Sequence, residues 1–132
     1  MPLITRRASL ALAAALALAV PLAAQAQKKY DTGADDKEIR IGNLVPYSGP
    51  ASAYGTAGKA MAAVFAKATA EGGVNGRKIK FSSLDDGYNP AKTGEQARKL
   101  VEEDEALLLL APLGTAQNTA IHRYMNSKKV PH

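Results

Sequence analysis

The chain has 132 residues, a formal net charge of +5 and no cysteine. This length accommodates one small domain rather than two, and the lack of cysteine excludes disulfides, thiolate metal sites and a cysteine nucleophile. The positive residues are scattered among acidic ones, which is typical of a solvated surface and argues against nucleic-acid binding.

The first 26 residues have the layout of a secretory signal peptide. Arg6 and Arg7 precede a largely apolar run over residues 8–20, and Ala24-Gln25-Ala26 supplies the small-x-small pattern that signal peptidase accepts. The alternative is a membrane anchor, but the apolar run is too short for a comfortable span. We therefore expect cleavage after residue 26, a periplasmic location and a mature chain that does not span the membrane.

Residues 27–37 are polar and predict a flexible leader before the domain, which is expected over residues 38–132. Residues 39–45 alternate at first and then run apolar, which predicts a short strand. The next five residues, 46–50, are Pro-Tyr-Ser-Gly-Pro and predict a loop.

A helix is expected next, because apolar residues recur at steps of three and four and therefore share one face. The predicted inward face consists of Tyr54, Ala57, Met61, Val64, Phe65 and Ala68. Gly72-Gly73 ends this helix, and residues 78–84 begin with the alternation of a half-buried strand.

The rest of the chain repeats this order. Asn89-Pro90 predicts a helix N-cap followed by proline at the first helical position. Residues 106–110 form an apolar run that predicts a strand covered on both faces, a third helix is expected from about Ala116, and Val130-Pro131 indicates the entrance to a fourth strand. Such alternation predicts an α/β fold with a parallel sheet and helices on both faces.

In an open parallel sheet, ligands bind outside the carboxyl ends of the strands. Three loops are expected there, at residues 45–54, 85–89 and 111–117. Thr115 offers a hydroxyl at a helix start, where free N–H groups and the helix dipole suit a carboxylate, and Gly114 lets the backbone approach closely. The alternative is that this hydroxyl merely caps the helix.

Two tyrosines flank the first of these loops. Tyr47 and Tyr54 are candidates for the wall of a small-molecule pocket; the alternative is a place in the core, with Tyr54 fastening the helix to the sheet. Asn43, within the first strand, is expected to be a buried polar group tied to a neighbouring loop.

Asp85-Asp86 suggests an enzymatic interpretation as a metal pair or a general base. However, no histidine or further acid lies near in the sequence, and aspartates before a helix are ordinary caps. The sequence also lacks the nucleophile-elbow, phosphate-loop, zinc-protease and dinucleotide motifs. We therefore expect no catalytic residue, no metal ligand and no cofactor.

Several loose motifs occur in a fixed order. They are Ile39-Arg40-Ile41-Gly42, then Ser48-Gly49-Pro50 with Tyr54-Gly55, then Glu-Gly-Gly-Val-Asn-Gly-Arg-Lys-Ile at residues 71–79, then Asp85-Asp86 with Asn89-Pro90. The ordered set, from about residue 38 to residue 131, resembles the leucine/isoleucine/valine-binding protein family. These are type I periplasmic solute-binding proteins of ABC importers.

The resemblance implies two α/β lobes joined by a hinge that close on a ligand between them. The N-terminal lobe would hold an amino acid's carboxylate through a hydroxyl and backbone amides after the third strand, which matches Thr115 with Gly114 before it. The aromatic beside the ligand's side chain matches Tyr54. The residues expected to bind ligand are Tyr47, Ser48, Tyr54, Leu113, Gly114 and Thr115.

Members of the family continue well past this length, so residues 38–132 are expected to be an incomplete first lobe that does not bind tightly alone. The resemblance implies a substrate-binding component that captures amino acids, or related small carboxylates and amides, for an inner-membrane ABC permease. Branched-chain amino acids, amides, urea-like compounds and aromatic acids all stay open as ligands. An exported ligand-sensing or receptor domain of this fold, and an exported α/β enzyme using the aspartate pair, stay open as alternatives.

Overall fold

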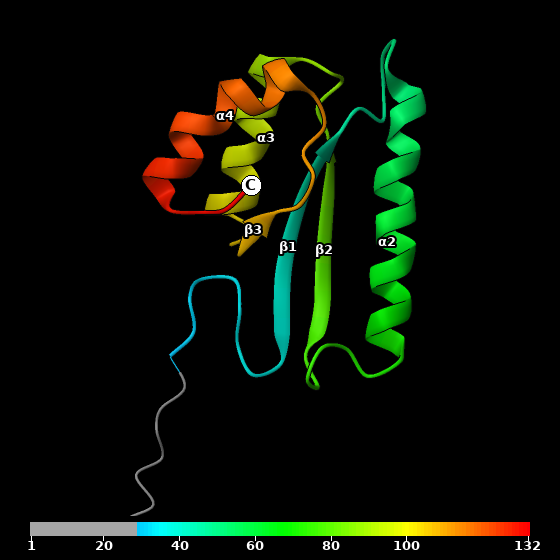
Figure 1. Cartoon of the computed structure of the whole chain (residues 1–132), viewed down its shortest axis with the longest axis vertical. Coiled ribbons are helices and arrows are strands. Elements are labelled where there is room, and N and C mark those ends of the chain that lie inside the picture. Colours follow the sequence, from blue (N-terminus) through cyan, green and yellow to red (C-terminus); the bar gives the residue numbers. More distant parts are fainter. Residues whose placement is uncertain (1–28) are drawn as a thin grey trace, which may run out of the picture.

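The computed structural model in Figure 1 describes residues 29–132, so the predicted signal peptide at residues 1–26 lies outside the described residues. Strands and helices alternate along the chain. In order they are strand β1 (Glu38–Val45), the short 3-10 helix η1 (Ser52–Tyr54), helix α2 (Gly55–Ala70), strand β2 (Lys78–Asp85), helix α3 (Pro90–Glu102), strand β3 (Leu108–Leu109) and helix α4 (Thr115–Lys128). Within residues 29–132, no helix combines the length and the apolar character needed to cross a membrane.

The three strands form one parallel sheet in the order β2-β1-β3. β1 and β2 pair along their whole length, from Glu38 opposite Lys78 to Val45 opposite Asp85. Helix α2 covers one face of the sheet, while α3 and α4 lie together on the other (Figure 1). The predicted α/β fold, with a parallel sheet and helices on both faces, is therefore confirmed.

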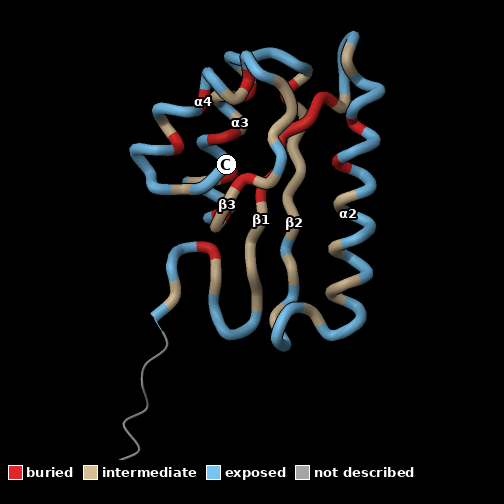
Figure 2. Tube along the Cα trace, viewed as in Figure 1, coloured by how far each residue is buried: buried red, intermediate tan, exposed pale blue. Residues whose placement is uncertain are grey.

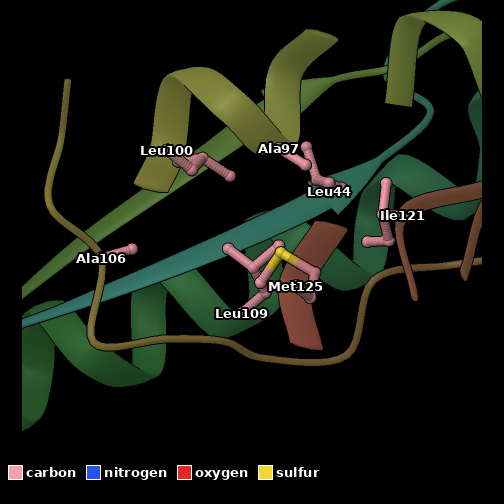
Figure 3. Packing of buried hydrophobic residues seen from close by; sticks show 7 residues of the cluster. All are labelled: Leu44, Ala97, Leu100, Ala106, Leu109, Ile121 and Met125. Carbon is pink, nitrogen blue, oxygen red and sulfur yellow. The ribbon is translucent and has the colours of Figure 1, made fainter. Parts of the chain in front are cut away.

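The core lies between the sheet and the pair α3 and α4 (Figure 3). Its buried members come from both strands and helices, and they are Leu44, Ala97, Leu100, Ala106, Leu109, Ile121 and Met125. Within β1, a Cβ on Gly42 would lie 2.5 Å from the Leu109 side chain, so glycine there lets the core side chains reach the sheet. Asn89 caps α3 as predicted, because its side chain accepts from the N–H groups of residues 91 and 92.

Helix α2 buries only part of the predicted face: Met61, Phe65 and Ala68 are half-buried, and the Phe65 ring contacts Phe81 of β2. Its only buried residues are Gly55 and Gly58, whereas Tyr54 and Val64 are 62% and 63% exposed. The prediction that these two side chains and Ala57 point inward was wrong. Because alanine is spread all round this helix, the apolar pattern does not specify a face. The close approach permitted by the two glycines helps to select the buried side. Figure 2 shows that most of α2 is exposed.

Strand β3 is shorter than the predicted run over residues 106–110. Backbone bonds to β1 nevertheless continue on both sides, from the Leu107 N–H to the Arg40 carbonyl and from the Leu110 N–H to the Gly42 carbonyl. On the outer edge of β3, the Leu109 N–H donates to the Pro131 carbonyl at 2.9 Å. The chain therefore runs beside β3 where a fourth strand was expected, although residues 129–132 are not assigned to a strand.

Part of the predicted leader contacts the sheet. The Gly33 carbonyl accepts from the Arg40 N–H at 2.8 Å, and Ala34 forms an isolated antiparallel bridge with Ile39. Gly33 is buried against the backbone of residues 105–107. The flexibility expected for residues 27–37 stays a prediction, but the described part of that segment is joined to β1 by backbone hydrogen bonds.

Candidate functional site

Three loops meet at the carboxyl end of the sheet, at the upper end of the molecule in Figure 1. They follow β1, β2 and β3 and comprise residues 46–51, 86–89 and 110–114; together with the first turn of α4 we call them the rim. The Leu113 N–H donates to the Leu44 carbonyl at 2.9 Å, which joins the third loop to β1. The Asp86 N–H reaches the Val45 carbonyl at 3.4 Å, which joins the second loop to the same strand.

A chain of hydrogen bonds made by side chains joins β1, β2 and the loop after β3. Asn43 is fully buried in β1, and its amide N–H groups donate to the carbonyls of Leu110 and Ala111 at 2.8 and 3.2 Å. Its amide oxygen accepts from the Ser83 hydroxyl at 2.7 Å. Because that hydroxyl uses its proton on Asn43, the Tyr47 hydroxyl, 2.5 Å away, donates to Ser83. The predicted role of Asn43 as a buried polar tie to a loop is confirmed.

This chain of bonds fixes where Tyr47 lies. The side chain is half-buried, and its ring and hydroxyl lie against the two buried glycines at the start of α2. A Cβ on Gly55 would be 2.8 Å from the tyrosine Cδ1. Much of Tyr47 therefore packs between the sheet and α2, and its hydroxyl is already bonded to Ser83.

Asp85 braces two rim loops. Its Oδ1 accepts from the N–H groups of Tyr47, Ser48 and Gly87 at 2.8, 3.1 and 2.9 Å. Its Oδ2 accepts from the Ser48 hydroxyl at 2.6 Å and from Lys92 Nζ at 3.1 Å. The Ser48 hydroxyl bond, supported by these N–H groups and the ammonium, holds the pKa of Asp85 far below its usual range. The Ser48 hydroxyl is thus engaged by the protein itself.

Asp86 has a different structural task. It is fully buried and accepts from the Thr93 hydroxyl at 2.8 Å and from the Tyr88 N–H at 3.0 Å. Both aspartates therefore hold loops, and the cap of α3 is supplied by Asn89. Within residues 29–132, no group of three or more histidine, cysteine or acidic side chains is placed to hold a metal ion.

The start of α4 is the part of the rim with free donors. Gly114 is the N-cap residue with φ 113°, and no side-chain hydrogen bond caps the helix. The N–H groups of the first turn, at residues 115–117, have no acceptor within the helix. Asn118 closes the preceding loop by donating to the carbonyls of Pro112 and Gly114 at 2.7 and 2.8 Å. Exposed Thr115 stands beside these donors.

The predicted site residues therefore lie at one end of the sheet, but they differ in exposure and in whether the protein already occupies their hydrogen-bonding groups. Leu113 is half-buried and bonded to β1, while Gly114 and Thr115 form the open helix start. Tyr54, in η1, is 62% exposed and so does not fasten α2 to the sheet. Ser48 belongs to the Asp85 brace.

Sequence reasoning missed two rim residues, Tyr88 and Gln117. Tyr88 has φ 59° and is 46% exposed. Gln117 is 1% exposed, donates from Nε2 to the Tyr88 carbonyl at 2.8 Å, and has an Oε1 with no hydrogen-bond partner. An aromatic residue directly after a loop glycine was the only available signal for the first; nothing in the pattern indicated the second.

A cavity of about 770 Å³ lies away from the rim. It follows the outer edge of β3 and is lined by residues of the leader, the end of α3 and the end of α4, including Val101, Leu108 and Val130. It marks the open edge of the sheet and not the loops that carry the free donors.

Comparison with known proteins agrees with this fold. The sequence pattern of the family described as "Periplasmic binding protein" matches residues 38–132. No curated protein matches. Among solved structures, the chain is similar to the branched-chain amino acid transporter substrate-binding protein LivJ from Streptococcus pneumoniae in complex with isoleucine, with 26% identity, a TM-score of 0.66, and coverage of 72% of this chain and 28% of that one.

Two further structures show the same fold. A substrate-binding periplasmic protein from Ralstonia solanacearum has 28% identity and a TM-score of 0.66, over 71% of this chain and 28% of that one. A fatty acid ABC transporter substrate-binding protein from Thermomonospora curvata has 24% identity and a TM-score of 0.68, over 78% and 27%. The chain thus spans little more than a quarter of the length of these structures. By its sequence pattern and its fold, the chain belongs to the periplasmic binding protein family.

Proposed function

We propose that the rim is one side of a cleft for a small carboxylate, and that the whole protein is the substrate-binding component of an ABC importer for amino acids or related carboxylates and amides. The observation that carries this proposal is the open start of α4. Here the N-cap is glycine, no side chain caps the helix, and the first helical residue is the exposed Thr115.

The chemistry of this helix start suits an anion. Three N–H groups and the positive end of the helix dipole favour a carboxylate at this point. Glycine at position 114 leaves room for the Gln117 side-chain amide and the Tyr88 ring beside the N-cap, and the two Asn118 bonds hold the loop in that shape. Donors fixed before binding lower the ordering cost of association. The LivJ structure, which contains isoleucine, supports an amino acid as the ligand class.

The hydrogen bonds of the two rim aspartates support ligand binding without catalysis. Asp85 and Asp86 accept hydrogen bonds from loop N–H groups, hydroxyls and one lysine. A carboxylate occupied in this way is poorly placed to act as a general base. We therefore propose that the protein binds its ligand unchanged and passes it to an inner-membrane permease from the periplasm, after export directed by residues 1–26.

The proposal is tested by titrating the whole protein with a panel of amino acids, amides and aromatic acids. Thr115→Ala should weaken carboxylate binding by about 1–3 kcal/mol, because a buried charged acceptor loses a donor. This corresponds to about a 5- to 150-fold rise in Kd. Thr119→Ala is the matched control, since this exposed threonine on the same helix donates only to the Thr115 carbonyl. An unchanged Kd for Thr115→Ala would place the carboxylate elsewhere.

A further inference from the structure

Tyr88 occupies the rim in a way that packing alone does not explain. Its φ of 59° lies in the left-handed region, which a bulky side chain adopts only at a cost. The ring remains 46% exposed, so little burial offsets that cost. Strain of this kind, in a residue held in place by its surroundings, is typical of sites that bind ligands.

Two neighbours hold Tyr88 in this position. The buried Asp86 accepts from its N–H at 3.0 Å, and the buried Gln117 donates to its carbonyl at 2.8 Å. The side-chain amide of Gln117 cannot be reversed without setting its oxygen against that carbonyl. Its Oε1 consequently stays buried without a partner, which is a second unfavourable feature retained at the same place.

The ring lies beside the open helix start. The Gln117 amide fills the space that a side chain at residue 114 would take, and the tyrosine Cε2, 2.9 Å from such a Cβ, borders the same space. A carboxylate bound by the N–H groups of residues 115–117 would therefore have the Tyr88 ring next to it. The rest of such a ligand would extend past the face or the edge of that ring.

We propose that Tyr88 is a specificity-determining wall of the ligand cleft, which contacts the side chain of the bound carboxylate and favours a flat, aromatic one. Gln117 and Asp86 act as positioning residues that hold the tyrosine backbone. The inference rests on the proposed carboxylate site at the start of α4 and names the ligand class that this site prefers. Aromatic rings gain from contact with another ring beyond the area that they bury.

The test compares two probes on the whole protein, benzoate and isoleucine, by calorimetric titration. Tyr88→Ala should weaken the binding of benzoate about tenfold more than that of isoleucine, because only benzoate loses a ring contact. Tyr88→Phe should retain the wild-type ratio of the two dissociation constants, since the ring remains. Val74→Ala is the control, because Val74 is similarly exposed at 43% but lies in the turn before β2, at the opposite end of the sheet.

A second measurement separates selection from a structural role. Tyr88→Gly removes the unfavourable side chain at positive φ, so the variant should unfold thermally no earlier than the wild type while losing the preference for benzoate. Equal weakening of both probes by Tyr88→Ala, or an earlier unfolding of Tyr88→Gly with the preference intact, would overturn the inference. A wild-type protein that binds no carboxylate would instead refute the proposed function itself.

Discussion

The hydrogen bonds of the Asp85 carboxylate hold two rim loops together, and the effect of removing them on stability can be worked out from the structure. Asp85→Ala leaves three backbone N–H groups without their acceptor, at residues 47, 48 and 87. A bond to a charged acceptor contributes about 1.5–3 kcal/mol, but the Asp85 side chain is 29% exposed and water replaces part of it. We expect Asp85→Ala to lower the free energy of unfolding by about 2–4 kcal/mol.

Asp85→Asn should cost much less, about 1 kcal/mol. The amide keeps an oxygen where the three N–H groups point, and the Ser48 hydroxyl can turn to accept instead of donate. The lost ion pair with Lys92, whose side chain is 40% exposed, contributes less than about 1 kcal/mol. Asp85→Asn should also leave ligand affinity nearly unchanged, because the loop keeps its shape.

The contribution of Asp85 to the free energy of unfolding should decrease as the pH falls. The pKa of Asp85 is lowered in the folded protein, chiefly by the Ser48 hydroxyl bond, from an ordinary value of 3.8. The stabilisation is therefore present above that value and is lost as the pH falls through the folded-state pKa. The gap in unfolding free energy between wild type and Asp85→Asn should shrink when the pH is lowered from about 7 to about 3.

Urea denaturation of the whole protein measures these differences at each pH. Glu95→Ala is the control, since this exposed residue on α3 should change stability by less than about 0.5 kcal/mol. If Asp85→Ala costs no more than Asp85→Asn, the carboxylate does not brace the loops. A loss of ligand affinity of about a hundredfold in Asp85→Asn would show that the Asp85 carboxylate contacts the ligand.

Three other predictions concern packing and titration. Gly58→Ala should destabilise the protein by about 1–3 kcal/mol, because its Cβ would lie 2.7 Å from the Val45 side chain; Gly94→Ala, on α3 with open space around it, should instead stabilise by about 0.5–1 kcal/mol in thermal unfolding. Leu100→Ala should cost about 2–5 kcal/mol in denaturant titration, since Leu100 is fully buried in the core, and a smaller loss would mean that the site collapses around the cavity. Burial and a hydrogen bond to Glu102 raise the pKa of Tyr124 from 10.0 to about 12, so ultraviolet titration should detect a tyrosine that ionises near pH 12, and the free energy of unfolding should fall as the pH rises between those two values.

Local signals predicted the sheet and two of the helices well. Alternation over residues 39–45 and 78–84 indicated β1 and β2 to within one residue at each end, because the signal comes from neighbouring positions. The pair Asn89-Pro90 located the start of α3 for the same reason. The inward face of α2 was predicted only in part, at Met61, Phe65 and Ala68, since alanine makes every face apolar and tertiary contacts at two glycines also select the buried side.

The position of the rim was predictable from the sequence, but the hydrogen-bond partners of its side chains were not. Parallel strands bring their carboxyl ends to one edge, so loops far apart in sequence were expected to meet there. Whether a given hydroxyl is free depends on partners far away in the chain, such as Asp85 for Ser48 or Ser83 for Tyr47. The same holds for Tyr88, whose position depends on a glutamine 29 residues later.

The hydrogen bonds within the rim therefore reduce the number of predicted residues that can donate to a ligand. A hydroxyl that already donates within the protein must break that bond before it can donate to a ligand carboxylate, so it adds little net affinity. Ser48 and Tyr47, whose hydroxyls are bonded to Asp85 and Ser83, therefore shape the loop. Among the six predicted residues, Gly114 and Thr115 are those that stand next to donors with no partner inside the helix. A rim whose other loops are already bonded together can keep these donors in place before a ligand arrives, which is the condition under which a few weak hydrogen bonds produce useful affinity.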